Sequence, residues 1–362
     1  MKKVTVTPQT ISSMKMKFIA IAALGIFFAA CSKTDLQTPD ALLKADALNA
    51  EANEQGKLAL KFKLGAEPIH FNAPFLFPEG MVYDAANDRF FVSSIAQGTI
   101  GTVSRKGIYS PFIQDAALAS TAGMEIDKAH DRLSVTNAKV EGTLAQLVIY
   151  DLNTKARLHL VDLVAVANDG APHLANDVAI DQQGNAYVTD SYAGIIYKVE
   201  PNGTASIFYQ NAAYTPAPGA FGFNGIEYSN SKGGYLLVAH SALNQIIRIP
   251  VDNPAALTTV QLDKSIVSPD GLLLSKNSKE LIIVNNTAGG PGSKVTSYVS
   301  ANGWSTGINT GEFSTGTVYP TTLTSDGKTE YVLYSYIHYL FGGQPKETFT
   351  IQPLPFKSTN PY

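Results

Sequence analysis

The stretch NDVAIDQQGNAYVTD, residues 176–190, consists of two short strand-like segments joined by a polar turn. Its first half has five counterparts at intervals of 43 to 54 residues: EGMVYD from Glu79, AGMEID from Ala122, NGIEYS from Asn224, DGLLLS from Asp270 and PTTLTS from Pro320. A second apolar segment follows each of them, as RFFVSS follows EGMVYD. A fixed period of this length with several short strands per unit predicts radial repetition. The sequence therefore predicts an all-β fold, a six-bladed β-propeller.

The period divides the chain into six expected blades, with boundaries near 75–120, 121–172, 173–220, 221–266, 267–316 and 317–362. Alternating segments that end in Gly/Asn turns, such as GIIYKVEPNG, are expected as outer strands. Residues 159–169, HLVDLVAVAND, are the best helix candidate, but we expect a strand and a connecting loop there. Residues 58–65, LALKFKLG, alternate like an edge strand, which we expect to close the ring by pairing with the last blade.

Composition narrows the classes of function. The 362 residues are 45% hydrophobic and only 16% charged, with 29 Gly and 19 Pro, which suits a large, turn-rich β-domain. A net charge of −3 offers no basic surface, so we expect no nucleic-acid partner. The single cysteine excludes an internal disulfide, and stability must come from core packing and ring closure.

The N-terminus predicts a targeting segment. Lys15 and Lys17 precede an apolar run, residues 18–30, that is too short to span a bilayer as a mature helix. The run leads directly to Cys31 and resembles a bacterial lipoprotein lipobox, with Phe28 in the place of the usual Leu. Residues 1–30 are therefore expected to be a lipoprotein signal peptide, with lipid attached to Cys31. The alternative is an ordinary secreted protein with an incidental cysteine.

Residues 31–57 are rich in Ala, Asp and Asn and lack aromatic residues. This composition predicts a flexible tether, followed by the propeller over residues 58–362. The expected location is the bacterial cell envelope, with membrane contact only through the lipid on Cys31.

The first residues of the six repeated segments form a column: Glu79, Ala122, Asn176, Asn224, Asp270 and Pro320. Equivalent positions on the innermost strands of a propeller form a ring around its axis. Four of these six residues carry a side-chain oxygen, and hard oxygen donors suit Ca²⁺, with Mg²⁺, Mn²⁺ or Zn²⁺ as other candidates. The alternative is that Asn and Asp at strand starts are turn residues that bond their own backbone.

A second column lies two residues after the common valine of the second strand: Ser94, Asn137, Asp190, His240, Asn286 and Tyr334. All six are polar in otherwise apolar strands. They would contact a substrate or orient metal ligands if buried, or simply reach solvent at the strand ends. His240 is the candidate for substrate contact or proton transfer, and Asn286 is a second substrate candidate.

Several motifs resemble the gluconolactonase/regucalcin family (senescence marker protein family) of six-bladed propellers. They are PEG at 78–80, ANDVAIDQQGNAYVTDSYAGIIYKV at 175–199, FNGIEYS from Phe223 and SPDGLLLS from Ser268. The resemblance implies a divalent metal held by Glu79, Asn176, Asn224 and Asp270. It also implies Asp270 as the general base in lactone hydrolysis.

The chain departs from the family pattern near the substrate. Sugar-lactone members carry an Arg two residues before the first Asn, where this chain has Leu174, with His173 beside it as a substrate candidate. The His pair of the more distant paraoxonases is replaced by Gly123 and Asn137. A hexonolactone substrate is therefore in doubt, whereas the metal set is intact.

The leading hypothesis is a monomeric, metal-dependent hydrolase that opens a small-molecule lactone or related ester. Water would be activated by a divalent cation and Asp270 at the channel mouth. The chain lacks G-x-S-x-G, so a Ser nucleophile has no support. One alternative is a non-catalytic, metal-stabilised propeller that binds a ligand or protein, with Phe71, Phe75, Phe77, Phe221 and Phe223 as the recognition surface. Another is carbon–carbon bond formation or a different metal-independent activity.

Overall fold

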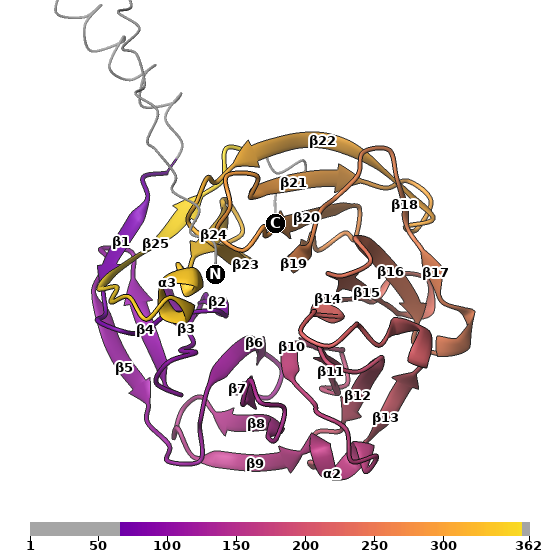
Figure 1. The fold of residues 1–362 in the computed structure, drawn as a ribbon, viewed down its shortest axis with the longest axis horizontal. Helices are drawn as coiled ribbons and strands as arrows, with labels where there is room; N and C mark the ends of the chain where they lie inside the picture. Colours follow the sequence, from indigo (N-terminus) through magenta and orange to yellow (C-terminus); the bar gives the residue numbers. More distant parts are fainter. Residues whose placement is uncertain (1–65, 357–362) are drawn as a thin grey trace, which may run out of the picture. The chain divides into compact units, whose positions relative to one another are not determined.

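Six small sheets are arranged around a central axis in the computed structural model, which describes residues 66–356 (Figure 1). Blade 1 contains β2 (Met81–Asp84), β3 (Arg89–Val92), β4 (Ile100–Ser104) and β5 (Tyr109–Ile113). Blade 2 contains β6 (Thr121–Asp127), β7 (Arg132–Ala138), β8 (Ala145–Asp151) and β9 (Arg157–Asp162). Blade 3 contains β10 (Ala175–Ile180), β11 (Ala186–Asp190), β12 (Ile195–Val199) and β13 (Ala205–Gln210).

The second half of the ring repeats this plan. Blade 4 contains β14 (Phe223–Ser229), β15 (Tyr235–His240), β16 (Gln245–Pro250) and β17 (Thr258–Thr259). Blade 5 contains β19 (Pro269–Leu274), β20 (Glu280–Asn285), β21 (Lys294–Val299) and β22 (Thr306–Ser314). Blade 6 contains β23 (Pro320–Ser325), β24 (Glu330–Tyr334), β25 (Thr348–Pro353) and β1 (Ile69–Asn72). The predicted six-bladed β-propeller is confirmed.

The ring is closed by β1, which pairs with β25 from Ile69 opposite Ile351 to Asn72 opposite Thr348. The outer strand of blade 6 thus comes from the N-terminal side of the propeller, and its other three strands come from the C-terminal side. Residues 58–65, the segment predicted to close the ring, lie outside the described residues.

The structure differs from the sequence-based expectation at three places. The segments expected as outer strands are the third strands, and a fourth, more exposed strand lies beyond each of them. β18 (Gln261–Leu262) pairs parallel with β22 of blade 5, although residues 261–262 were expected in blade 4. The prediction of a loop after residue 162 is wrong: Leu163–Ala167 form helix α2, and the Asp162 carboxylate accepts the Ala165 N–H at its start.

Four further connections contain short helices. Helix α3 (Ile337–Phe341) follows β24, and 3₁₀ helices occupy Ala212–Tyr214, Ser231–Gly233 and Pro254–Ala256. Helix α3 lies in the connection from β24 to β25 of blade 6 (Figure 1). Among the described residues, no helix has the length and apolar character needed to cross a bilayer.

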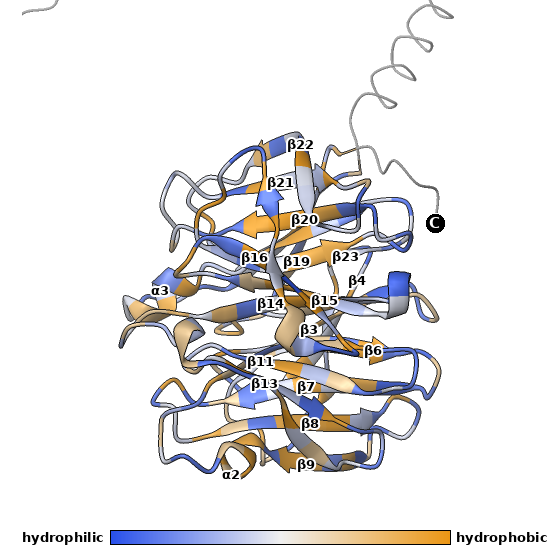
Figure 2. Cartoon of the chain, turned by 90° about the vertical axis from the view of Figure 1, so that its right-hand side faces the viewer, coloured by the Kyte–Doolittle hydropathy of each residue, from blue (hydrophilic) through white to orange (hydrophobic). Residues whose placement is uncertain are grey.

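The hydrophobic core lies within and between the blades. Phe90 and Val92 of blade 1 belong to one buried cluster with Tyr331 and Leu333 of blade 6. In the side view, apolar residues concentrate along the strands, and many connecting loops are hydrophilic (Figure 2). Apolar residues of neighbouring blades are thus buried against each other, and this packing stabilises the ring without a disulfide.

Three of the five aromatic residues proposed as a recognition surface belong to this core. Phe71, Phe77 and Phe223 are at most 1% exposed, which contradicts their predicted place on a surface. Phe75 and Phe221 remain exposed. The predicted signal peptide over residues 1–30, Cys31 and the tether over residues 31–57 lie outside the described residues.

Candidate functional site

Irregular pairing at the starts of the inner strands positions the first column of polar residues. The ladder shifts register between Ala175 and Val178 in β10, between Phe223 and Ile226 in β14, and between Pro269 and Leu272 in β19. The residues omitted from these ladders include Asn176, Asn224 and Asp270. A β-bulge changes the direction of the side chains at the extra residues, which explains how these three reach a common space.

Glycines after the column residues let neighbouring inner strands approach closely. A Cβ on Gly80 would collide with the backbone of Ala122 in the next blade, and a Cβ on Gly225 would collide with the carbonyl oxygen of Asp270. Alanine at either position would push two inner strands apart. The absence of a side chain there thus holds adjacent column residues close together.

Hydroxyl groups of adjacent blades fix the backbone of the column residues. The hydroxyls of Thr136, Thr189 and Thr321 donate to the carbonyl oxygens of Asn176, Asn224 and Glu79, at 2.8, 2.7 and 2.7 Å. All three threonines are 2% exposed or less. The bonds join blade 2 to 3, blade 3 to 4, and blade 6 to 1, so the ring itself positions these residues.

One pocket of about 220 Å³ is lined by all four predicted metal ligands, Glu79, Asn176, Asn224 and Asp270. Asp270 and Asn224 are 7% and 8% exposed, whereas Glu79 and Asn176 are half-buried. The structure therefore brings together four residues that are almost two hundred positions apart at their extremes. Their role as ligands stays a prediction.

The pocket concentrates negative charge. Burial raises the pKa of Asp270 to about 7, and nearby Asp177 adds to this, while hydrogen bonds from Asn286 and Asn224 oppose it. The pKa of Glu79 is also raised well above its usual range, first by burial and then by repulsion from Asp270 and Asp177. Among the described residues that line the pocket, none is Lys, Arg or His. No basic side chain in the lining offsets these carboxylates.

This donor set fits a hard divalent cation. Ca²⁺ accepts carboxylates, amide carbonyls and water together, and its charge would offset the repulsion between the buried acids. Within residues 66–356, no three His, Cys, Asp or Glu side chains are grouped as a metal site. A cation here therefore depends on the oxygens of Asn176 and Asn224 in addition to the two carboxylates.

Asn286, predicted as a substrate contact, lies in the pocket beside Asp270. Its Nδ2 donates to Asp270 Oδ2 at 2.8 Å, and its Oδ1 accepts the Ala288 N–H at 2.9 Å. These two bonds fix the orientation of the amide group. The clearest role of Asn286 in the structure is thus to orient the Asp270 carboxylate.

His240 does not line this pocket. It is 1% exposed, and its Nε2 bonds the Tyr214 carbonyl oxygen at 2.9 Å while its Nδ1 accepts the Leu243 N–H at 3.2 Å. Because Nδ1 accepts, the proton belongs on Nε2, and burial lowers the pKa of His240. The ring is a neutral structural group here, engaged at both nitrogens.

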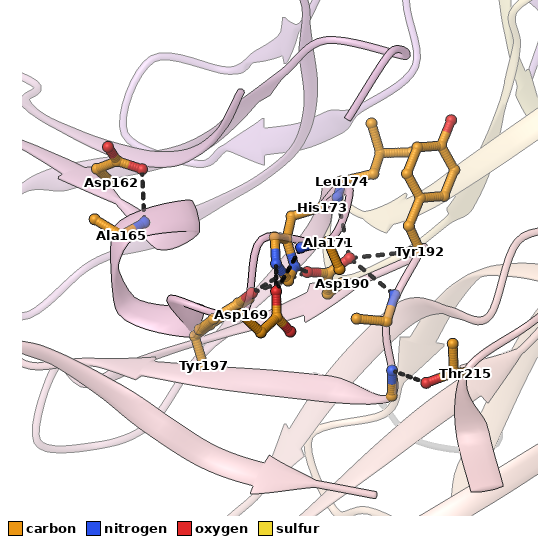
Figure 3. A network of polar contacts seen from close by, with 12 residues as sticks. Asp162, Ala165, Asp169, Ala171, His173, Leu174, Asp190, Tyr192, Tyr197 and Thr215 are labelled. Carbon is orange, nitrogen blue, oxygen red and sulfur yellow. Dashed lines mark hydrogen bonds and ion pairs between the residues drawn. The ribbon is translucent and has the colours of Figure 1, made fainter. Parts of the chain in front are cut away.

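His173 does not line the pocket either; it belongs to a network of polar contacts with Asp169 and Asp190 (Figure 3). Its Nδ1 lies 2.7 Å from Asp190 Oδ2, and its Nε2 lies 3.0 Å from Asp169 Oδ1. Asp190 also accepts the hydroxyl of Tyr197 at 2.9 Å and the Leu174 N–H at 3.0 Å. The bond to Asp190 raises the pKa of His173 despite its burial. This network fixes the segment that carries Leu174 to the pocket.

The two columns do not include Tyr319, which lines the pocket, or Asp177, whose charge acts on Glu79 and Asp270. Tyr319 lines the pocket, and burial raises its pKa, with the charges of Asp270 and Glu79 adding to the effect. Asp177 accepts the N–H groups of Val178 and Ile226 at 2.9 and 3.1 Å, and thereby joins blade 3 to blade 4. A signal for Asp177 was present, because the same position is glycine in four of the other repeats.

Comparison with known proteins gives the fold a context. No protein-family model matches the chain, and no curated protein matches it. Among solved structures, the chain is similar to the major allergen Mala s 1 of Malassezia sympodialis, with a TM-score of 0.66 and 16% identity over 80% of this chain and 96% of that one.

Two similar structures carry names that bear on the site. A gluconolactonase from Xanthomonas campestris has a TM-score of 0.56 and 13% identity, over 79% of this chain and 89% of that one. The calcium-binding protein regucalcin from Agrobacterium tumefaciens has a TM-score of 0.52 and 14% identity, over 77% and 90%. At these identities the likeness shows the fold alone.

Proposed function

We propose that the protein is a metal-dependent hydrolase that opens a lactone or a related ester in the pocket lined by Glu79, Asn176, Asn224 and Asp270. The observation that carries the proposal is this set of four oxygen-bearing side chains in one pocket whose described lining has no basic side chain. The similarity of the fold to a gluconolactonase and to a calcium-binding propeller supports it.

A divalent cation, most simply Ca²⁺, would supply a positive charge that polarises the substrate carbonyl. Asp270 accepts one proton from the attacking water, whose oxygen bonds to the carbonyl carbon. The ester C–O bond then breaks, and the proton passes from Asp270 to the leaving alkoxide, so that the product is a hydroxy acid. Asn286 keeps the carboxylate of Asp270 in position through its bond of 2.8 Å.

The test is a panel of aliphatic, aryl and sugar lactones, assayed with Ca²⁺ and with chelator. We expect turnover that chelator abolishes and that Asp270→Asn reduces at least a hundredfold, an effect in the range of general-base catalysis. Asp181→Asn is a matched control, because Asp181 is also 7% exposed but lies in the β10–β11 turn, outside the pocket. Calcium binding without turnover of any lactone would instead favour the non-catalytic, ligand-binding alternative.

We also propose that residues 1–30 direct the chain to the cell envelope and that Cys31 carries lipid. Metabolic labelling with a fatty acid in a bacterial host tests this directly. Label should be incorporated into the wild-type chain and lost in Cys31→Ala.

A further inference from the structure

The pocket combines an acidic interior with an apolar rim. The residues that supply the rim are Ile95, Val140, Leu174, Phe221, Ile337 and Phe341. Val140, Phe221 and Phe341 are 59%, 38% and 65% exposed, so they lie towards solvent, whereas Asp270 and Asn224 are almost fully buried. Apolar side chains are left exposed around an opening where a ligand can cover them.

These rim residues come from separate parts of the ring. Val140 follows β7, Leu174 precedes β10, and Phe221 precedes β14, while Ile337 and Phe341 lie on helix α3. Helix α3 contacts the blade 5 loop, because a Cβ at Gly289 would collide with the ring of His338. His338 also stacks on Tyr319, with ring centroids 5.9 Å apart. The apolar rim is therefore part of a packed structure.

Several polar groups of the pocket are already engaged within the protein. Asn224 Nδ2 donates to Ser241 Oγ at 3.0 Å, and that hydroxyl donates to the Pro269 carbonyl oxygen at 2.7 Å. The Thr321 hydroxyl and the Asn286 amide are engaged with Glu79 and Asp270. The hydroxyl groups of a polyhydroxylated ligand would therefore have to compete with these internal bonds for partners.

An anionic ligand is not favoured, because the two carboxylates among the described lining residues would offset the charge of a bound divalent cation and none of these residues is basic. The cavity volume of about 220 Å³ lies below the roughly 300–1,000 Å³ of ordinary ligand pockets, so the ligand is small. What remains is a small, uncharged molecule with one polar end for the acidic interior and an apolar remainder for the rim.

We propose that the substrate is a small lactone or ester that carries an alkyl or aryl group, which contacts Leu174 and Phe341. This inference rests on the proposed hydrolase activity and specifies its substrate class. Leu174 and Phe341 are then specificity-determining residues. Leu174 precedes β10 of blade 3 and Phe341 lies on α3 of blade 6, and these two blades face each other across a six-bladed ring.

The experiment compares hydrolysis of γ-nonalactone, which carries a pentyl chain, with that of γ-butyrolactone and gluconolactone. We expect kcat/KM for γ-nonalactone to exceed that for either of the others by about 10- to 100-fold, since the methylenes are only partly covered at an open rim. Leu174→Asn and Phe341→Ser should each lower the ratio of kcat/KM for γ-nonalactone to that for γ-butyrolactone about 10-fold.

Ile108→Ser is the matched control, because Ile108 is 61% exposed and lies outside the pocket. Equal kcat/KM for the three lactones, or a preference for gluconolactone, overturns the inference while the hydrolase proposal stands. If no lactone is turned over, the hydrolase proposal fails, and calorimetric titration with γ-nonalactone in Ca²⁺ decides the ligand class. Binding that Leu174→Asn weakens then supports an apolar ligand, and no binding overturns it.

Discussion

Replacing Asp270 with asparagine should stabilise the metal-free protein at alkaline pH, although it removes the proposed catalytic base. Burial raises the pKa of Asp270 from its ordinary 3.8 to about 7. Between these values the folded protein holds a proton that the unfolded chain has lost, so this carboxyl lowers the stability as the pH rises from about 4 to about 7. At about 1.36 kcal/mol per pH unit, the full cost is about 4 kcal/mol above pH 7.

Asp270→Asn avoids this cost and retains an oxygen that can accept the Asn286 N–H. In chelator at pH 8, we expect its free energy of unfolding to exceed that of the wild type by up to about 4 kcal/mol, or about 5–10 °C in Tm. At pH 4.5 the difference should shrink to about 1 kcal/mol, since the folded carboxyl is then protonated and the pH is less than one unit above the unfolded pKa of 3.8. The assay is urea unfolding at both pH values, with chelator present throughout.

Asp84→Asn is the control, because Asp84 is 5% exposed but has a cationic partner, with Arg89 Nε 2.9 Å from its carboxylate. Removing that charge should destabilise the protein by about 2 kcal/mol at pH 8. The reasoning is refuted if Asp270→Asn is destabilising at pH 8 in chelator, as Asp84→Asn is. That result would mean that a counter-charge for Asp270 is already present in the protein.

Three further outcomes are expected. Calcium should raise the Tm of the wild type by mass action, and Glu79→Gln should shrink that rise; an equal rise in both would exclude Glu79 as a ligand. Thr189→Val should lower the free energy of unfolding by about 1–3 kcal/mol in urea titrations, because the Asn224 carbonyl loses its donor, and a neutral effect would contradict the inter-blade bond. The raised pKa of His173 adds stability below about pH 6.5 that is lost as the pH rises through the folded value. His173→Gln should therefore be destabilised by about 3 kcal/mol at pH 6, with a smaller deficit at pH 8, and a constant deficit would contradict a charged His173–Asp190 pair.

The sequence was sufficient to predict the ring because the inner-strand segment recurs six times at similar intervals. In blade 6 the register shift lies between Pro320 and Leu323, so Thr321, and not Pro320, occupies the column position. Equivalent positions on inner strands must meet around the axis, and Glu79, Asn176, Asn224 and Asp270 accordingly line one pocket. The bulges in β10, β14 and β19 occur at the same position of the repeat, so Asn176, Asn224 and Asp270 remain equivalent in the structure.

The parts that were not predicted depend on connections between repeats. Helix α3 spans only Ile337–Phe341, too short for a periodic pattern, yet it supplies two residues of the apolar rim. β9 and β13 are largely exposed and lack the continuous apolar residues of the inner strands. An alignment of the repeats does not show what a residue contacts. His240 is aligned correctly, but its ring bonds the carbonyl oxygen of Tyr214, which lies in the connection between β13 and β14.

The most direct test of the central claim is a calcium-soaked crystal structure with anomalous scattering data. The account predicts one strong peak on the channel axis, about 2.3–2.6 Å from the side-chain oxygens of Glu79, Asn176, Asn224 and Asp270. A peak elsewhere, or none in the channel at millimolar calcium, would contradict it.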